Sequence, residues 1–339
     1  MPFNLKKNHE QQLQYAVFGK LPRRADFIRI NAGHPMVQDV DQRFARSLAD
    51  ITVNPEWVEA YLGHGPSEFM LRSQDGKWSF LGVVHPSQDE AGRKYPLSAG
   101  VCVPGESLTG AEALYLLANE LFYTGLRDQL SSAIDNSVEM LACKQFLEEQ
   151  ISFSARSAAD IDLAEQLLQR YMSQLSSQTL GQRLQAAGLQ DLESTLLAFM
   201  FYLKLVQRFG AGMSPQVFVL PLPAQQGEAI LGAAVWLDLY RTATEFLPAH
   251  PINLALITRA EQKYLVLSPA EFDQKTIQLF WGADLQLARS ILAQGQVGPW
   301  CSHQRYAEAA YVLGRQLSDP SLNVLKLKAV VRQIASNID

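Results

Sequence analysis

Three side chains within one short segment have the residue types of a hydrolytic triad. His85, Ser87 and Asp89 lie in a polar stretch between residues 85 and 94. A histidine base beside a serine nucleophile and an orienting aspartate is the arrangement that cleaves acyl bonds. Side chains this close on one loop rarely align in that order, and the GxSxG elbow of the α/β-hydrolases is absent. We expect Ser87 and Asp89 to satisfy backbone donors instead, and a hydrolase that uses residues 85–93 is the less favoured alternative.

A second segment places a glycine and a lysine directly after an apolar run. Gly19 and Lys20 suggest a phosphate-binding loop, but a Walker motif needs a second glycine five residues earlier and a serine or threonine after the lysine. Those positions hold Gln14 and Leu21. The segment has instead the residues of a shaped turn, because Gly19 permits a positive φ and Pro22 stiffens the exit. We therefore predict no bound nucleotide and no other cofactor.

Potential metal ligands are scattered along the chain. The six histidines include no pair at i, i+4 spacing and no HExxH motif. Cys102, Cys143 and Cys301 are far apart and form no CxxC pair, so neither a zinc site nor a disulfide framework is indicated. Thiols that stay reduced fit the cytosol. We expect no metal ligand and no catalytic residue, and hence a protein that is not an enzyme.

The composition is that of an ordinary globular protein. The chain has 339 residues, of which 47% are hydrophobic and 19% charged, and this length suggests roughly two domains. A formal net charge of −5 with scattered basic residues argues against a nucleic-acid partner. The most apolar segment, 196–206, is too short to span a membrane, and the first residues lack the apolar core of a secretory signal. We predict a cytoplasmic protein without direct membrane insertion.

The periodicity of the first 150 residues predicts an α/β domain. A strand is expected at 13–18, helices at 36–51 and 54–63, and strands at 68–72, 78–84 and 97–103. Asp75 and Gly76 indicate a hairpin turn, and a capping box at 109–112 opens a long helix. The order β-α-α-β-β-β-α predicts a mainly antiparallel sheet flanked by helices, which is an α/β fold of the α+β kind. We assign residues 1–150 to this domain.

The rest of the chain is predicted to hold a connector and a second α/β unit. Residues 151–190 belong to a Ser-, Gln- and Ala-rich helical connector, and 191–339 to a C-terminal α/β domain that ends in helices. The elements expected in that domain are a helix at 192–209 that is apolar almost all round, strands at 217–220, 253–257 and 263–267, helices at 228–240 and 269–281, the latter with a capping box at 268–271, and a helical tail broken at Asp319-Pro320.

The residues of the two loops fall into two groups. The residues expected to shape the loops are Gly19, Pro22, Asp26, Phe27, Trp78, Gly82, Pro86, Asp89, Gly92, Arg93 and Pro96. Arg93 and Asp26 sit near the ends of strands that should be neighbours, so we predict a structural ion pair between them. The candidate partner-binding residues are Lys20, Arg23, Arg24, Arg29, Ser87 and Lys94.

The order and spacing of these residues resemble the N-terminal signature of the TagF proteins, also called ImpM. The resemblance covers about residues 13–105. It rests on Phe18-Gly19-Lys20-Leu21-Pro22, Asp26-Phe27, Trp78, Gly82, Pro86-Ser87, Asp89, Gly92-Arg93 and Tyr95-Pro96-Leu97. Ala25 departs from the family pattern, which usually has glycine before the aspartate. Because alanine resists a positive φ, we expect a remodelled turn there.

The resemblance implies a function that the residues alone do not give. TagF proteins are post-translational repressors of type VI secretion assembly in the bacterial cytoplasm, and they are linked to the forkhead-associated scaffold protein of that apparatus. The implied activity is therefore protein–protein binding without catalysis. Residues 150–339 carry no motif that we can assign, so a structural adaptor that joins the apparatus through its helical C-terminal half is the alternative.

Overall fold

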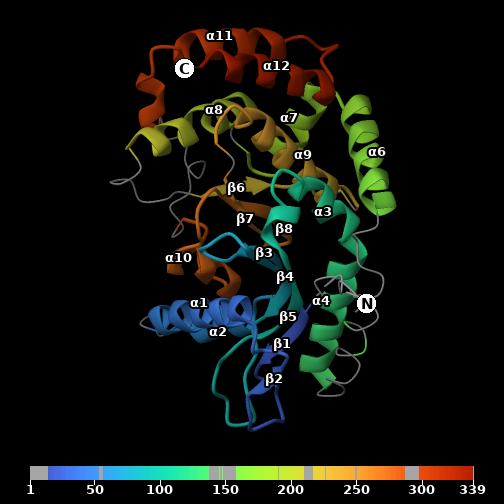
Figure 1. Ribbon diagram of the computed structural model, residues 1–339, viewed down its shortest axis with the longest axis vertical. Helices are drawn as coiled ribbons and strands as arrows, with labels where there is room; N and C mark the ends of the chain where they lie inside the picture. Colours follow the sequence, from blue (N-terminus) through green and yellow to red (C-terminus); the bar gives the residue numbers. More distant parts are fainter. Residues whose placement is uncertain are drawn as a thin grey trace, which may run out of the picture.

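A single antiparallel sheet forms the centre of the molecule. The computed structural model describes residues 14–52, 56–136, 145, 147, 158–189, 191–209, 217–225, 227–248, 250–286 and 298–338. Within these residues eight strands pair in the order β2-β1-β5-β4-β3-β7-β8-β6, and every neighbouring pair is antiparallel. The predicted fold class, an antiparallel sheet with flanking helices, is confirmed (Figure 1).

The strands lie close to their predicted positions. Their bounds are β1 (Gln14–Gly19), β2 (Ile28–Ile30), β3 (Ser67–Arg72), β4 (Trp78–His85), β5 (Leu97–Pro104), β6 (Phe218–Pro221), β7 (Asn253–Arg259) and β8 (Gln262–Ser268). The predicted hairpin turn between β3 and β4 is confirmed, with Gly76 at a φ of 69°. Sequence analysis does not predict β2, because three residues are too few to show a period.

Helices cover both faces of the sheet. On one face lie α1 (Pro35–Ile51), α2 (Trp57–Leu62), α10 (Gln274–Gln278) and a 3-10 turn at Leu279–Trp281. On the other lie α3 (Glu112–Ala118), α4 (Glu120–Asn136), α8 (Leu192–Phe209) and α9 (Glu228–Ala243). Alternation along β3 divides the two cores, since Phe69 and Leu71 pack under α1 whereas Met70 faces the opposite way.

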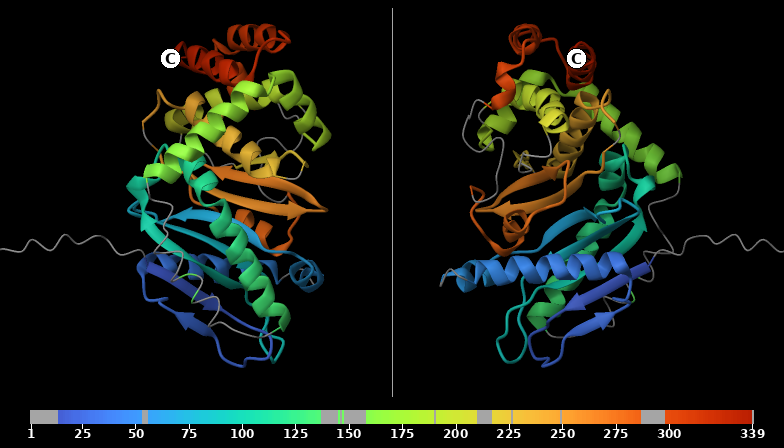
Figure 2. Two further views of the ribbon diagram at one scale, coloured as in Figure 1. Left: turned by 90° about the vertical axis from the view of Figure 1, so that its right-hand side faces the viewer. Right: turned by 60° about the vertical axis from the view of Figure 1, so that its left-hand side comes forward.

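The remaining helices form a layer at one end of the molecule. They are α6 (Ala158–Gln174), α7 (Ser177–Ala186), α11 (Tyr306–Leu317) and α12 (Val324–Ser336), with a 3-10 turn at Pro299–Ser302. A further 3-10 turn at Gly105–Ser107 follows β5 and contacts the turn between β3 and β4. The predicted break between α11 and α12 is confirmed. Figures 1 and 2 place this pair at the end of the long axis opposite β1 and β2.

Both predicted capping boxes are wrong. Thr109 accepts a hydrogen bond from Arg72 at 2.8 Å instead of capping, and the predicted long helix is divided into α3 and α4 at Asn119. The second helix begins later, where Asp273 accepts from the Thr276 amide at 2.8 Å. In the first case a tertiary partner outcompetes the local cap. The start predicted at residues 54 and 55 lies outside the described residues, whereas the end of α2 at Gly63 is confirmed.

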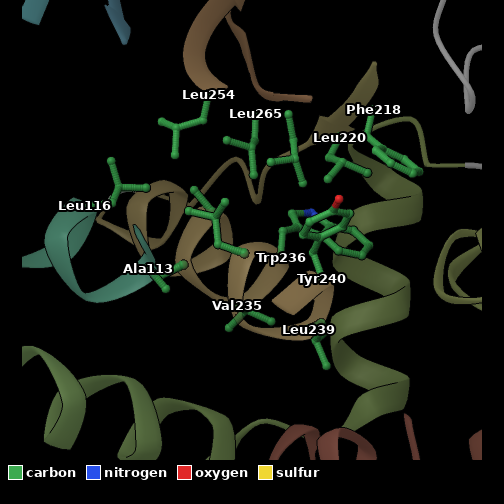
Figure 3. Close-up of a cluster of buried hydrophobic side chains, with 14 of the residues drawn as sticks. Ala113, Leu116, Phe218, Leu220, Val235, Trp236, Leu239, Tyr240, Leu254 and Leu265 are labelled. Carbon is green, nitrogen blue, oxygen red and sulfur yellow. The ribbon is translucent and has the colours of Figure 1, made fainter. Parts of the chain in front are cut away.

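The sheet runs across the division that we predict between residues 150 and 191. β3 pairs with β7 in the register Phe69↔Ala255, so strands from the C-terminal half extend the sheet of the N-terminal half. The shared core continues beneath them. Figure 3 shows Leu254 and Leu265 pointing towards Trp236 of α9. The figure also places Ala113 and Leu116 of α3, as well as Phe218 and Leu220 of β6, around the same cluster.

Trp281 offers a test of how far the N-terminal helices depend on the C-terminal half. Its side chain is fully buried, its indole Nε1 donates to Ser47 Oγ of α1 at 3.0 Å, and its ring lies 5.3 Å from that of Phe44. We expect Trp281→Ala to lower the free energy of unfolding by about 3–5 kcal/mol, measured by urea denaturation. Phe246→Ala, at a half-exposed position, should change it by about 0.5 kcal/mol or less. Equal effects would contradict this account.

Candidate docking site

The two loops singled out in the sequence lie against each other beside the end of β1. The Glu90 amide donates to the Arg24 carbonyl oxygen at 3.1 Å, and Arg93 Nη2 donates to the Ala25 carbonyl oxygen at 3.0 Å. Both contacts join residues that are more than 60 positions apart in sequence. The loops therefore form one surface, at the end of the molecule opposite α11 and α12 (Figure 1).

A buried carboxylate holds the loops together. The Asp89 side chain is fully buried. Its Oδ2 lies 2.8 Å from Lys20 Nζ and 2.6 Å from Arg93 Nε, and its Oδ1 accepts from the Arg93 amide at 2.8 Å. The hydrogen bond from Lys20, with those from Arg93, holds the pKa of the Asp89 carboxyl well below its usual range against the opposing effect of burial.

The predicted ion pair between Asp26 and Arg93 is wrong. Arg93 pairs with Asp89, four residues earlier on the same loop, and Asp26 is exposed to solvent. The reason is burial: a carboxylate without water needs cationic partners more than an exposed one does. Asp89 thus takes the structural role that the sequence analysis gives to Asp26.

The three residues of the hypothetical triad bind different partners. His85 Nδ1 lies 2.9 Å from the Pro86 carbonyl oxygen, and burial lowers the pKa of its imidazole. Asp89 is held by the two cations, and it accepts from a backbone amide as predicted. Ser87 is buried, and its hydroxyl has no hydrogen-bond partner in the described part of the chain. Its backbone amide and carbonyl instead each bind the Tyr61 hydroxyl at 3.0 Å, so the predicted role of the Ser87 side chain is wrong.

A left-handed arginine shapes the first loop. The Arg24 amide donates to the Leu21 carbonyl oxygen at 3.2 Å, with Pro22 in the second position and Arg23 in the third at a φ of 66°. These are the features of a type II turn, whose third position favours glycine or asparagine. The remodelling expected at Ala25 thus does not involve a left-handed alanine, since the left-handed residue is Arg23.

Glycines allow close backbone approaches on both sides of the loops. Gly19 has a φ of 131°, and a Cβ there would collide with the Pro96 carbonyl oxygen at the start of β5. Gly82 pairs with Gly100 across the sheet, and a Cβ on it would collide with the Ala99 carbonyl oxygen. Gly92, at a φ of 77°, closes the second loop. These predicted shaping residues are therefore required by backbone geometry.

Aromatic rings support the strand that follows the first loop. The Phe27 ring lies edge-on to Tyr95 at 5.1 Å, and the Arg29 guanidinium lies 5.0 Å above the Phe27 ring. The Tyr95 hydroxyl donates to the Asp41 carbonyl oxygen of α1 at 3.0 Å. Trp78 makes a similar edge-on contact with His34 at 4.7 Å. Sequence analysis does not identify Tyr61 and Asp41 as part of the site, because neither belongs to a loop motif. Asp41 lies in α1 and Tyr61 in α2, and both contact the second loop, which is distant in sequence.

The candidate partner-binding residues divide into buried and exposed sets. Lys20 is only 15% exposed and Ser87 is buried, whereas Lys94 donates back to the Gly92 carbonyl oxygen at 2.8 Å. Arg23 and Arg24 are exposed, and 67% of the Arg29 side chain is exposed. We call Arg23, Arg24 and Arg29 the arginine edge. A depression of about 490 Å³, lined by residues 24–30, lies beside it.

A larger cavity lies away from the loops, where β7 and β8 meet α4. It measures about 570 Å³. Two of its charged side chains, Arg127 and Glu68, form an ion pair at 2.9 Å. Burial, with the nearby Arg259, lowers the pKa of His64 to about 3, so this histidine is neutral at physiological pH.

Among the described residues, no cluster of three or more His, Cys, Asp or Glu side chains could hold a metal ion. None of the described helices is long and apolar enough to cross a membrane.

Fold and loops together define an α/β protein that is built on an antiparallel sheet and displays a cationic loop surface. Residues 16–150 match the TagF N-terminal domain, which is type VI secretion system-associated, and the match contains both loops. This part of the chain is therefore a TagF-type N-terminal domain. The crystal structure of PA0076 from Pseudomonas aeruginosa PAO1 is similar at 25% identity and a TM-score of 0.31, over 39% of this chain and 60% of that one. The chain thus spans less than two thirds of that protein. A comparison with curated proteins finds no match.

Gly19 is predicted to tolerate no side chain. Because a Cβ would meet backbone rather than a flexible side chain, we expect Gly19→Ala to destabilise the fold by about 3 kcal/mol or more. Gly33→Ala is the matched control, since a Cβ there meets nothing within 4 Å, and it should be neutral or slightly stabilising. Urea denaturation of both variants gives the comparison, and a mild effect at Gly19 would refute the packing argument.

Asp89 should make the stability of the fold depend on pH. Its folded-state pKa is depressed, so its stabilising contribution is present above the unfolded-state pKa of about 3.9 and is lost as the pH falls towards the folded-state pKa. We expect Asp89→Asn to melt well below the wild type at pH 7, and the difference to narrow below about pH 4. Arg93→Ala should cost less, because the Arg93 side chain is 64% exposed. Asp26→Asn, at an exposed position, should have little effect at either pH. A difference that widens in acid would contradict this assignment.

Proposed function

We propose that the protein is a non-catalytic cytoplasmic accessory protein that represses type VI secretion assembly after translation. It acts by binding a protein of the apparatus, and the forkhead-associated scaffold component is the partner that the family resemblance implies. The observation that carries this proposal is the TagF N-terminal domain match over residues 16–150, which includes both loops.

The contacts made by the loop side chains support a binding role. The side chains whose types suggest chemistry are engaged in positioning: Asp89 pins two cations, and His85 contacts a neighbouring carbonyl. The exposed side chains of the loops include the arginine edge, and arginine is among the residues that dominate protein–protein contacts. A fixed backbone that displays exposed arginines suits recognition, because little conformational entropy is lost on binding.

Charge reversal at the first loop should separate binding from folding. We expect Arg23→Glu with Arg24→Glu to reduce the recovery of the secretion component roughly tenfold while the melting temperature stays close to that of the wild type. The measurement is affinity recovery of the tagged full chain from a host with an active type VI system, with quantitative mass spectrometry of the recovered subunits.

The matched control reverses two exposed cations at the opposite end of the molecule, Arg315→Glu with Lys326→Glu. This variant carries the same change in net charge and should retain binding. Failure of the wild-type chain to recover any secretion subunit would count against the proposed function. Loss of recovery in the control variant alone would favour the adaptor role of the C-terminal helices.

A further inference from the structure

The two edge strands of the sheet differ in their exposure to solvent. Among the described strands, the sheet ends at β6 on one side and at β2 on the other. All four residues of β6 are buried, whereas β2 has an exposed arginine between two half-buried isoleucines. The last strand of a sheet leaves a row of backbone N–H and C=O groups available for another chain. β2 is therefore the edge strand that is exposed to solvent.

A short end strand with a charged side chain is also a common way to prevent unwanted pairing. β2 has only three residues, so its position alone does not indicate a ligand. Three further observations do indicate a ligand: the charges beside β2, the conformation of Arg23, and the depression lined by residues 24–30.

Positive charge gathers beside β2 although the whole chain has a formal net charge of −5. Among the described residues, no ion pair involves Arg23 or Arg24, and the closest carboxylate to Arg29, that of Asp41, is 3.9 Å away. The exposed acids of the same loops are Asp26 and Glu90. Because Arg23 and Arg24 have no ion pair among the described residues and Arg29 has only the long contact with Asp41, the three arginines can attract an external carboxylate.

The turn before β2 presents an arginine at a conformational cost. Arg23 occupies the left-handed position of a type II turn, where glycine or asparagine is the favoured residue. A side chain in a disfavoured backbone conformation is a reason to look for a function. The turn directs two consecutive arginines, Arg23 and Arg24, to the surface.

The depression follows the course of the strand. Residues 24–30 line its volume of about 490 Å³, and these residues include all of β2. Ile28 and Ile30 pack against the core that contains Val17, while Arg29 pairs with Phe18 in the register and lies towards α1. An extended segment laid in this depression would have the backbone of β2 on one side and the arginine edge within reach.

We propose that β2 is a docking edge for an extended acidic segment of the protein partner, which adds to the sheet as a further strand beside β2. Backbone hydrogen bonds to β2 supply affinity, and carboxylates on the segment pair with Arg23, Arg24 and Arg29. This inference deepens the proposed function and rests on it, because it names the chemistry of the partner surface.

A pair of peptides tests the chemistry on the full-length protein. The probes are a labelled nine-residue peptide that alternates glutamate and valine, and the same peptide with lysine in place of glutamate. We expect fluorescence anisotropy at low salt to show the glutamate peptide binding roughly tenfold more tightly than the lysine peptide, with affinity falling as salt rises. Equal binding of the two peptides, or binding of neither, overturns the proposal.

Variants and hydrogen exchange test the location. Arg24→Glu with Arg29→Glu should reverse the preference between the peptides, Arg24→Gln with Arg29→Gln should abolish it without reversal, and Arg315→Glu with Lys326→Glu should leave it unchanged. Saturation with the glutamate peptide should slow amide exchange within residues 24–30. Protection elsewhere in the protein, with none in this segment, overturns the proposal even if the peptide binds.

The same variants distinguish this inference from the proposed function. If the wild type recovers a secretion component from the native host and the Arg24→Glu, Arg29→Glu variant recovers it equally well, the regulatory function stands and the docking edge is wrong. If the glutamate peptide protects residues 24–30 but no secretion component is recovered, the docking edge stands and the assigned partner is wrong.

Discussion

The burial of one carboxylate organises the loop surface. Asp89 has no access to water, so its charge must be balanced inside the protein, and it draws Lys20 from one loop and Arg93 from the other. Arg93 then reaches the Ala25 carbonyl oxygen, which fixes the backbone between the type II turn and β2. The neighbouring arginines are left outside this network. The cations of the loops thus fall into two groups: Lys20 and Arg93 bind Asp89, whereas Arg23, Arg24 and Arg29 are exposed.

Two further contacts position the backbone of the loops around this ion network. Gly19 lets β1 approach the start of β5, and the Tyr61 hydroxyl binds the backbone of Ser87 from beneath the second loop. Both contacts position backbone groups of the loops, and they add to the constraint that the Asp89 ion network supplies. A surface fixed in this way needs little reorganisation for the binding that we propose.

The sequence predicts most of the local structure and little of the long-range structure. Strands such as β4 and β5 were predictable within one or two residues because their apolar runs are bounded by turn residues. The capping box at Thr109 fails since Arg72, distant in sequence, takes the hydroxyl. The sequence analysis selects Asp26 as the partner of Arg93, whereas in the structure Arg93 pairs with the buried Asp89. The pairing of Phe69 with Ala255 has no local signal, and the exposure of Arg23, Arg24 and Arg29 is seen only in the folded loops.

The position of β3 in the middle of the sheet has a consequence for synthesis on the ribosome. β3 pairs with β4 soon after both are made, but its other side waits for β7, roughly 190 residues later in the chain. At about 5–20 residues per second, this interval lasts on the order of ten to forty seconds. During that time an apolar strand has an unpaired side in the nascent chain, and such unpaired strand edges are prone to aggregation until their partner is made.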